Sequence, residues 1–142
     1  MGRLAMAVMV GVLASAAPVR AQEPVAAANQ PAMIFFGWGG PEIDRDAAAT
    51  LDEIATNFAK EPGATLHIDG HSDRSGPAGV NRRTSRQRAE AVRSYLAARG
   101  VPVSAMTTAG HGEEQPIIAT ADGVREPQNR RVEIRFGPST HR

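Results

Sequence analysis

The alternation of apolar and polar residues predicts four short β-strands. An apolar run at 33–36 ends at a glycine-rich stretch, which is typical of a buried strand. Residues 65–69 and 131–136 alternate clearly, whereas 105–109 does so weakly. In the strand at 131–136 we expect two sets of side chains to face opposite ways: Val132, Ile134 and Phe136 inward, and Arg131, Glu133 and Arg135 outward.

The segments between these strands carry the three-to-four-residue apolar repeat of helices. Asp44 can cap the first helix, and Glu61-Pro62-Gly63 ends it. Its apolar stripe consists of Leu51, Ile54, Ala55 and Phe58. The second helix should begin near Asn81, which can cap it, and stop at Gly100 and Pro102. Its inward stripe consists of Ser85, Ala89, Val92 and Leu96.

The resulting order, βαβαββ, predicts a two-layer α/β (α+β) sandwich in which both helices pack on one face of a mixed sheet. We expect one domain at 33–137. The stretch 22–32 is rich in Ala, Pro and Gln without periodicity and is interpreted as a linker, and 138–142 as a flexible tail.

The N-terminus has the pattern of a secretory signal peptide. Arg3 precedes an apolar run at 4–17, and small residues at 19–21 predict cleavage after Ala21. The run of 14 residues is shorter than the ~20 that a membrane-spanning helix needs. An uncleaved anchor is the alternative. We therefore expect a soluble, exported mature protein without a transmembrane segment.

The basic residues of the chain are concentrated in one stretch. Removal of 1–21 takes two arginines and no acid, so the formal charge falls from 16 − 15 = +1 to 14 − 15 = −1. Residues 74–99 nevertheless hold seven arginines against the single acid Glu90. This local surplus favours one anionic or zwitterionic partner over general polyanion binding. The absence of cysteine excludes disulfides, thiolate metal sites and cysteine nucleophiles.

Catalytic and metal chemistry can be weighed for four residues, which are His71, Ser72, Asp73 and His111. A His-x-Asp pair with a distant histidine can bind a metal, and a serine near them can suggest acyl transfer. The chain has no G-x-S-x-G motif, and neither histidine lies in a predicted helix, where a second ligand could stand one turn away. We therefore expect neither catalysis nor a metal site, and we expect His71 and His111 to order their turns by hydrogen bonding.

Asp73 and Arg88 together suggest a site for a zwitterion. Asn81, Thr84 and Arg88 share one face of the second helix, and this face looks toward the turn that bears Asp73. A carboxylate can take an ammonium group, and a guanidinium can take a carboxylate with two parallel hydrogen bonds. Nucleic-acid binding is disfavoured by the export signal, the near-zero charge and the few aromatic residues. Four other arginines are interpreted as a solvated helix face: Arg82, Arg83, Arg93 and Arg99.

Four motifs in this order resemble the OmpA-like C-terminal domain family. They are G-H-S-D-x-x-G at 70–76, N-x-x-x-S-x-x-R-A-x-x-V at 81–92, G-x-G-x-x-x-P-I at 110–117 and N-R-R-V-E-I at 129–134. The family includes the peptidoglycan-associated lipoprotein and the periplasmic part of flagellar motor stators. The resemblance implies the βαβαββ fold and a non-catalytic function without cofactors. That function is binding of peptidoglycan through the meso-diaminopimelate of its stem peptide, in the periplasm, in association with the outer membrane or the cell wall.

The resemblance also implies roles for individual residues. Asp73 and Arg88 would clasp the amino and carboxylate groups of diaminopimelate. Asn81 would shape the turn or touch the peptide, and Ser72 and Thr84 would lie beside it. The N-R-R motif supplies Arg130 and Arg131, one of which would brace the site while the other lies on the strand surface; Arg130 is included among the candidate site residues.

One departure from the family bears on affinity. Where the family commonly reads F-F-D-W-D, this chain has Gly37 and Gly39 in place of the two acids, which removes a possible contact and loosens the loop. The alternative function is therefore an interaction module of the same fold that binds outer-membrane or other envelope proteins, with weak or no binding to the cell wall.

Overall fold

The computed structural model describes residues 30–138, and its four strands form a single sheet. The strands are β1 (Ala32–Phe35), β2 (Thr65–Gly70), β3 (Met106–Gly110) and β4 (Arg131–Gly137). The helices are α1 (Arg45–Ala59) and α2 (Ala78–Ala98), with short 3-10 turns η2 (Val103–Ala105) and η3 (Pro127–Asn129). The predicted signal peptide, residues 22–29 of the predicted linker, and the tail after 138 lie outside the described residues.

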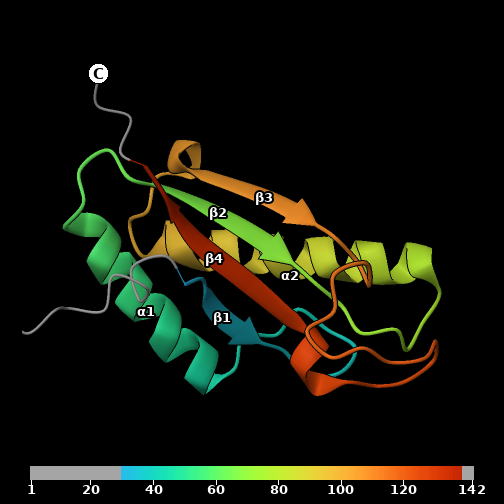
Figure 1. Cartoon of the computed structure of the whole chain (residues 1–142). Coiled ribbons are helices and arrows are strands. Elements are labelled where there is room, and N and C mark those ends of the chain that lie inside the picture. Colours follow the sequence, from blue (N-terminus) through green and yellow to red (C-terminus); the bar gives the residue numbers. More distant parts are fainter. Residues whose placement is uncertain (1–29, 139–142) are drawn as a thin grey trace, which may run out of the picture.

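The predicted βαβαββ order is confirmed, with a mixed sheet in the order β1-β4-β2-β3 (Figure 1). β2 and β3 are parallel, and β4 runs antiparallel to both β1 and β2. The strand that comes last along the chain therefore lies in the middle of the sheet. Its start lies beside the ends of β1 and β2, where Phe36 donates to the carbonyl of Arg130 and His71 donates to that of Arg131. The ends of three strands meet there.

One core lies between the sheet and the helices. Both predicted helical stripes enter it, because Leu51, Ile54, Ala89, Val92 and Leu96 are buried against the inward side chains of the strands. The strand contribution comes from Ile34, Leu66, Ile68, Met106, Val132 and Ile134. The prediction was wrong for Phe136, which is 44% exposed because it lies near the end of β4.

Glycines let α2 lie close to the ends of β2 and β3. A Cβ on Gly70 would collide with the carbonyl of Ser85, and one on Gly110 would lie 2.7 Å from the backbone nitrogen of Arg86. Such contacts force the helix away from the sheet unless the strand residue is glycine. The close approach fixes the helical turn that carries Arg88 above the strand ends.

The start of α2 differs from the prediction. The helix begins at Ala78 with Pro77 at its N-cap, so Asn81 lies inside the first turns and does not cap it. Proline suits a helix start because its φ, here −59°, is already helical and its missing N–H needs no partner. The side chain of Asn81 instead donates to the carbonyl of Gly76 and to Glu113, at 2.8 and 2.7 Å.

The alternation of β4 also predicts that its outward residues face solvent, and this is wrong for two of the three. Arg131 and Glu133 are buried, because they pair with each other at 2.9 Å and because the loop after β3 lies against them. Arg131 donates to the carbonyl of Gln115 in that loop. Arg135, half exposed, links Glu133 to Asp69 of β2. A paired charge network therefore occupies the sheet face opposite the helices.

The ring of His71 lies beside this network without a hydrogen bond. Within residues 30–138, neither of its nitrogens has a partner, and the ring stacks on that of His111 with centroids 5.1 Å apart. Only the backbone of His71 orders the turn, so the prediction for its side chain was wrong. The ring of His111 does bond, to Asp69 at 2.8 Å. Burial, followed by the charge of Arg131, lowers the pKa of His71 to about 4.

Candidate ligand-binding site

All six predicted site residues line one cavity of about 250 Å³ where the strand ends meet α2. They are Ser72, Asp73, Asn81, Thr84, Arg88 and Arg130. The helix supplies three of them from one face, and the loop after β2 and the start of β4 supply the others. The sequence therefore grouped them as the structure does, although it did not identify Trp38, Ser75 or Val80 in the same wall.

Asp73 is a fully engaged carboxylate. Its Oδ1 accepts from the backbone nitrogen and the hydroxyl of Ser75, and its Oδ2 accepts from the backbone nitrogen of Glu126 and from Arg130. A carboxylate has about four acceptor positions, and all of them are used here. Burial alone would raise the pKa of Asp73, but the bonds from Ser75, Arg130 and Glu126 hold it below its usual value.

Arg88 is the opposite case, a buried cation without a carboxylate partner. Arg88 is only 1% exposed. Its guanidinium donates hydrogen bonds of 3.2–3.4 Å to three backbone carbonyls, those of Gly37, Gly40 and His71. Within the described part of the chain, no carboxylate lies within 4 Å of it. Burial, and secondarily the charge of Arg130, lowers its pKa to about 10, so it stays protonated at neutral pH.

Arg130 and Arg131 diverge to opposite faces of the sheet. Arg130 reaches the cavity, where it binds Asp73 at 3.0 Å and the carbonyl of Phe36 at 3.2 Å. Arg131 reaches the paired network on the other face. The sequence left open which of the two supports the site, and in the structure Arg130 lies in it.

The charges of the cavity do not cancel. Arg88 and Arg130 contribute two positive charges and Asp73 one negative charge, so the formal sum is +1. Ser72 adds a buried hydroxyl that has no hydrogen-bond partner among the described residues. A buried polar atom without a partner is unfavourable until a ligand supplies one. The cavity therefore suits a ligand with a carboxylate and further polar groups beside it.

Two hydrogen bonds of Asn81 join the cavity wall to the loop after β3, through Glu113, and to the turn before α2, through Gly76. Thr84, half-buried one turn further along, also lines the cavity wall. Asn81 thus shapes the turn, as one of its two predicted roles requires.

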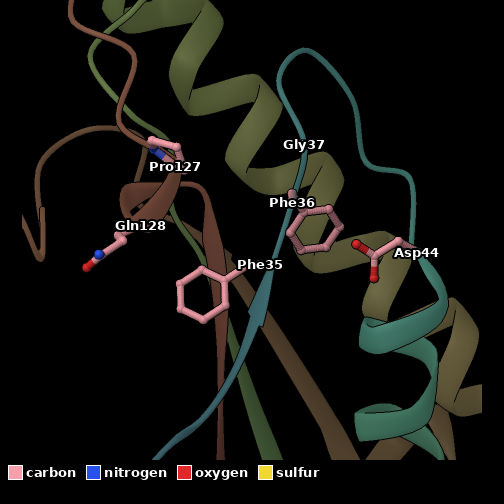
Figure 2. Close-up of a pocket in the computed structure, with 6 residues that line it drawn as sticks. All are labelled: Phe35, Phe36, Gly37, Asp44, Pro127 and Gln128. Atoms are coloured by element: carbon pink, nitrogen blue, oxygen red, sulfur yellow. The ribbon is translucent and has the colours of Figure 1, made fainter.

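A larger hollow of about 520 Å³ lies at the edge of the sheet, around β1 (Figure 2). Its walls include Phe35, which is half exposed, and the helix cap Asp44. The only charged side chain in this wall is Asp44, which already accepts from the backbone nitrogen of Ala47. The smaller cavity, with its unpaired guanidinium, is therefore the better candidate site.

Residues 30–138 contain neither a cluster of metal-binding side chains nor a helix that could span a membrane. No cluster of three or more histidine or acidic side chains there could hold a metal ion. Neither α1 nor α2 is long and apolar enough to cross a membrane.

The sequence of this chain is similar to those of proteins whose names refer to peptidoglycan. The profile of the OmpA family matches residues 35–130. The "Peptidoglycan-associated lipoprotein" of Rhizobium meliloti (strain 1021) is 40% identical over 99 residues, which are 70% of this chain and 56% of the relative. The "Peptidoglycan-binding protein ArfA" of Mycobacterium bovis is 37% identical over 101 residues, which are 71% of this chain and 31% of the relative. The chain thus spans about half or less of the length of these relatives.

The fold is also found in a solved structure. The crystal structure of the peptidoglycan-associated lipoprotein from Burkholderia pseudomallei matches with a TM-score of 0.69 at 27% identity, over 74% of this chain and 89% of that one. This match confirms the predicted fold class.

Proposed function

Because the chain belongs to the OmpA family, we propose that it binds peptidoglycan in the periplasm, without catalysing a reaction. The names of two relatives, a peptidoglycan-associated lipoprotein and a peptidoglycan-binding protein, support this ligand. The observation that carries the proposal is Arg88, a buried cation whose partners are all neutral carbonyls. A carboxylate from the ligand would complete its coordination.

We further propose that the ligand group is the amino-acid end of meso-diaminopimelate in the stem peptide. Its carboxylate binds Arg88, and its ammonium lies against Ser72 and Asp73. Since Asp73 has no vacant acceptor position, the ammonium shares an oxygen that is already bonded, and the free hydroxyl of Ser72 is its additional acceptor. Arg130 holds Asp73 in place, and Thr84 and Asn81 form the helical wall.

The direct test is co-sedimentation with purified diaminopimelate-type sacculi. Arg88→Ala removes the proposed carboxylate partner and should weaken binding by about 2–5 kcal/mol, which abolishes co-sedimentation at micromolar protein. Arg83→Ala is the matched control, because Arg83 is an exposed arginine of the same helix outside the cavity. Equal binding by the wild type and Arg88→Ala would contradict the site.

Sacculi with lysine in the stem peptide test the finer assignment. The lysine side chain ends in an ammonium group without the carboxylate that diaminopimelate carries there, so Arg88 would stay unpaired. Binding to lysine-type sacculi should therefore be at least about tenfold weaker. Indistinguishable binding to the two wall types would refute the diaminopimelate assignment while leaving peptidoglycan binding intact.

A second candidate function is an interaction module for envelope proteins. The observation that favours it is the pair of exposed apolar side chains on edge strand β1, Met33 and Phe35. Backbone amide resonances of 72–76 and of Arg88 distinguish the two functions. Shifts on addition of free meso-diaminopimelate support wall binding, and no shift at millimolar ligand favours the interaction module.

A further inference from the structure

Trp38 stands at the mouth of the candidate site. It is the only tryptophan of the chain, and it is 60% exposed in a loop between Gly37 and Gly39. Its side chain helps to line the cavity that contains Arg88. It also lines a neighbouring hollow of about 400 Å³ formed by the rest of the loop with Glu42 and Asp44. Trp38 is therefore the wall between the two spaces.

The indole is held in this position by Arg125. The guanidinium carbon of Arg125 lies 4.0 Å from the ring centroid, a close cation–π contact. Arg125 is itself placed by the site, because the next residue, Glu126, donates its backbone N–H to Asp73 at 3.1 Å. The arrangement joins the loop after β1 to the loop after β3 beside the cavity. It leaves the indole as a largely exposed, fixed aromatic surface.

We propose that Trp38 is a ligand-contacting residue that packs on the methylene chain of the bound diamino acid. This inference rests on the proposed function and extends it. The cavity, of about 250 Å³, receives the ammonium and carboxylate end of the diamino acid. The methylene chain of the diamino acid then passes through the cavity mouth. Trp38 and Gly39 line both spaces, so the chain leaves between them toward the 400 Å³ hollow. Aliphatic groups gain most from burial against a large apolar surface that is otherwise exposed to water.

The chemistry of the neighbouring hollow fits the continuation of a stem peptide. Its backbone-rich wall of Gly37, Gly39 and Gly40 presents amide groups. Within residues 30–138, the Glu42 carboxylate has no hydrogen bond or ion pair. Peptide N–H groups can bond to such acceptors. The diamino acid would fill the charged cavity and cover the indole with its methylene chain, and the rest of the stem peptide would continue into this hollow.

Fluorescence of the wild-type protein tests the inference without any substitution. Because Trp38 is the only tryptophan, its emission reports on this position alone. We expect the tripeptide L-alanyl-γ-D-glutamyl-meso-diaminopimelate to shift the emission to shorter wavelength and to reduce quenching by acrylamide. An unchanged emission and unchanged quenching, with ligand bound as judged by the amide shifts of Ser72 and Arg88, would overturn the inference.

Variants then measure the contribution of the ring. Trp38→Ala should weaken binding to diaminopimelate-type sacculi about tenfold, since about two methylenes lose their cover. Trp38→Phe keeps an aromatic surface and should retain most of the affinity. Arg125→Gln leaves the ring but removes its brace, so quenching in the free protein should rise and affinity should fall severalfold. Circular dichroism of each variant confirms that the fold is intact.

The outcomes separate this inference from the proposed function. Suppose that Arg88→Ala abolishes sacculus binding and Trp38→Ala leaves it at the wild-type level. The candidate site is then correct, and the indole is not part of it. If the wild type does not bind sacculi at all, both the proposed function and this inference fail.

Discussion

Two clusters of charge lie on opposite faces of the same sheet, and consecutive arginines belong to them. On the face opposite the helices, Arg131 and Arg135 balance Asp69 and Glu133, so the formal sum is zero. In the cavity, Arg88 and Arg130 face the single carboxylate of Asp73, so one positive charge is left over. A paired network needs no ligand, whereas a buried surplus charge is unfavourable until an anion arrives. The difference distinguishes a structural cluster from the candidate binding site.

The largest expected effect is that of Asp73→Ala. The substitution leaves Arg130 and Arg88 as two buried cations without a carboxylate, and it frees the loop that Glu126 ties to the site. We expect a loss of about 3–5 kcal/mol of unfolding free energy. Urea denaturation measures it. A stability within about 1 kcal/mol of the wild type would show that Asp73 does not organise the cavity.

In the network, Arg131→Met should destabilise the protein by about 3 kcal/mol, because Glu133 then has only the half-exposed Arg135 as partner. Thermal denaturation of the variant provides the measurement. Arg135→Met is the control, since that side chain is half exposed and its loss should cost at most about 1 kcal/mol. Equal effects of the two substitutions would mean that the network is not organised around its buried pair.

His71 should make stability sensitive to mild acid. Its pKa falls from 6.5 in the unfolded chain to about 4 in the folded one, so only the unfolded chain takes up the proton between these values. Stability is therefore full above about pH 6.5 and falls by about 2–3 kcal/mol as the pH drops toward 4.

Urea midpoints across this range check the expectation for His71. His71→Phe keeps a ring that can stack on His111 and should remove most of the acid dependence. His67→Gln, at an exposed position on β2, should leave the dependence in place. A similar acid dependence in His71→Phe and the wild type would assign it to other groups.

The smallest expected effect on stability belongs to Arg88→Met. Its three hydrogen bonds to carbonyls are long, and the substitution removes an unpaired buried charge, so unfolding free energy should change by no more than about 1 kcal/mol. Chemical denaturation next to Arg131→Met gives the comparison. A loss above about 3 kcal/mol for Arg88→Met would show that this arginine stabilises the fold and not a ligand.

The fold could be predicted from sequence, as could six of the residues that line the candidate cavity, because both depend on local spacing. Leu51, Leu66 and Leu96 follow helix and strand periods, and the helical repeat places Arg88 on the face of Thr84. The hydrogen bonds of Asp73 could be predicted only in part. A serine two residues after an aspartate is a turn signal, but the bonds from Glu126 and Arg130 join residues more than 50 positions apart.

The burial of Arg131 and Glu133 had no sequence signal, because alternation identifies the two faces of a strand and not which loop covers the second face. The start of α2 was misjudged because Asn81 has the chemistry of a cap. The proline that begins the helix stands four residues earlier, and Asn81 bonds backward to the turn and across to Glu113.

The central place of β4 ties the assembly of the site to the order of folding. β1 pairs only with β4 within the described sheet, and Arg130, which secures Asp73, directly precedes β4. Until β4 enters between β1 and β2, the edge strand β1 has no paired strand, and Asp73 in the cavity lacks its contact with Arg130. Such long-range pairing is intrinsically slow. A chain that has not yet folded therefore lacks the candidate site, which is complete only when the last strand is in place.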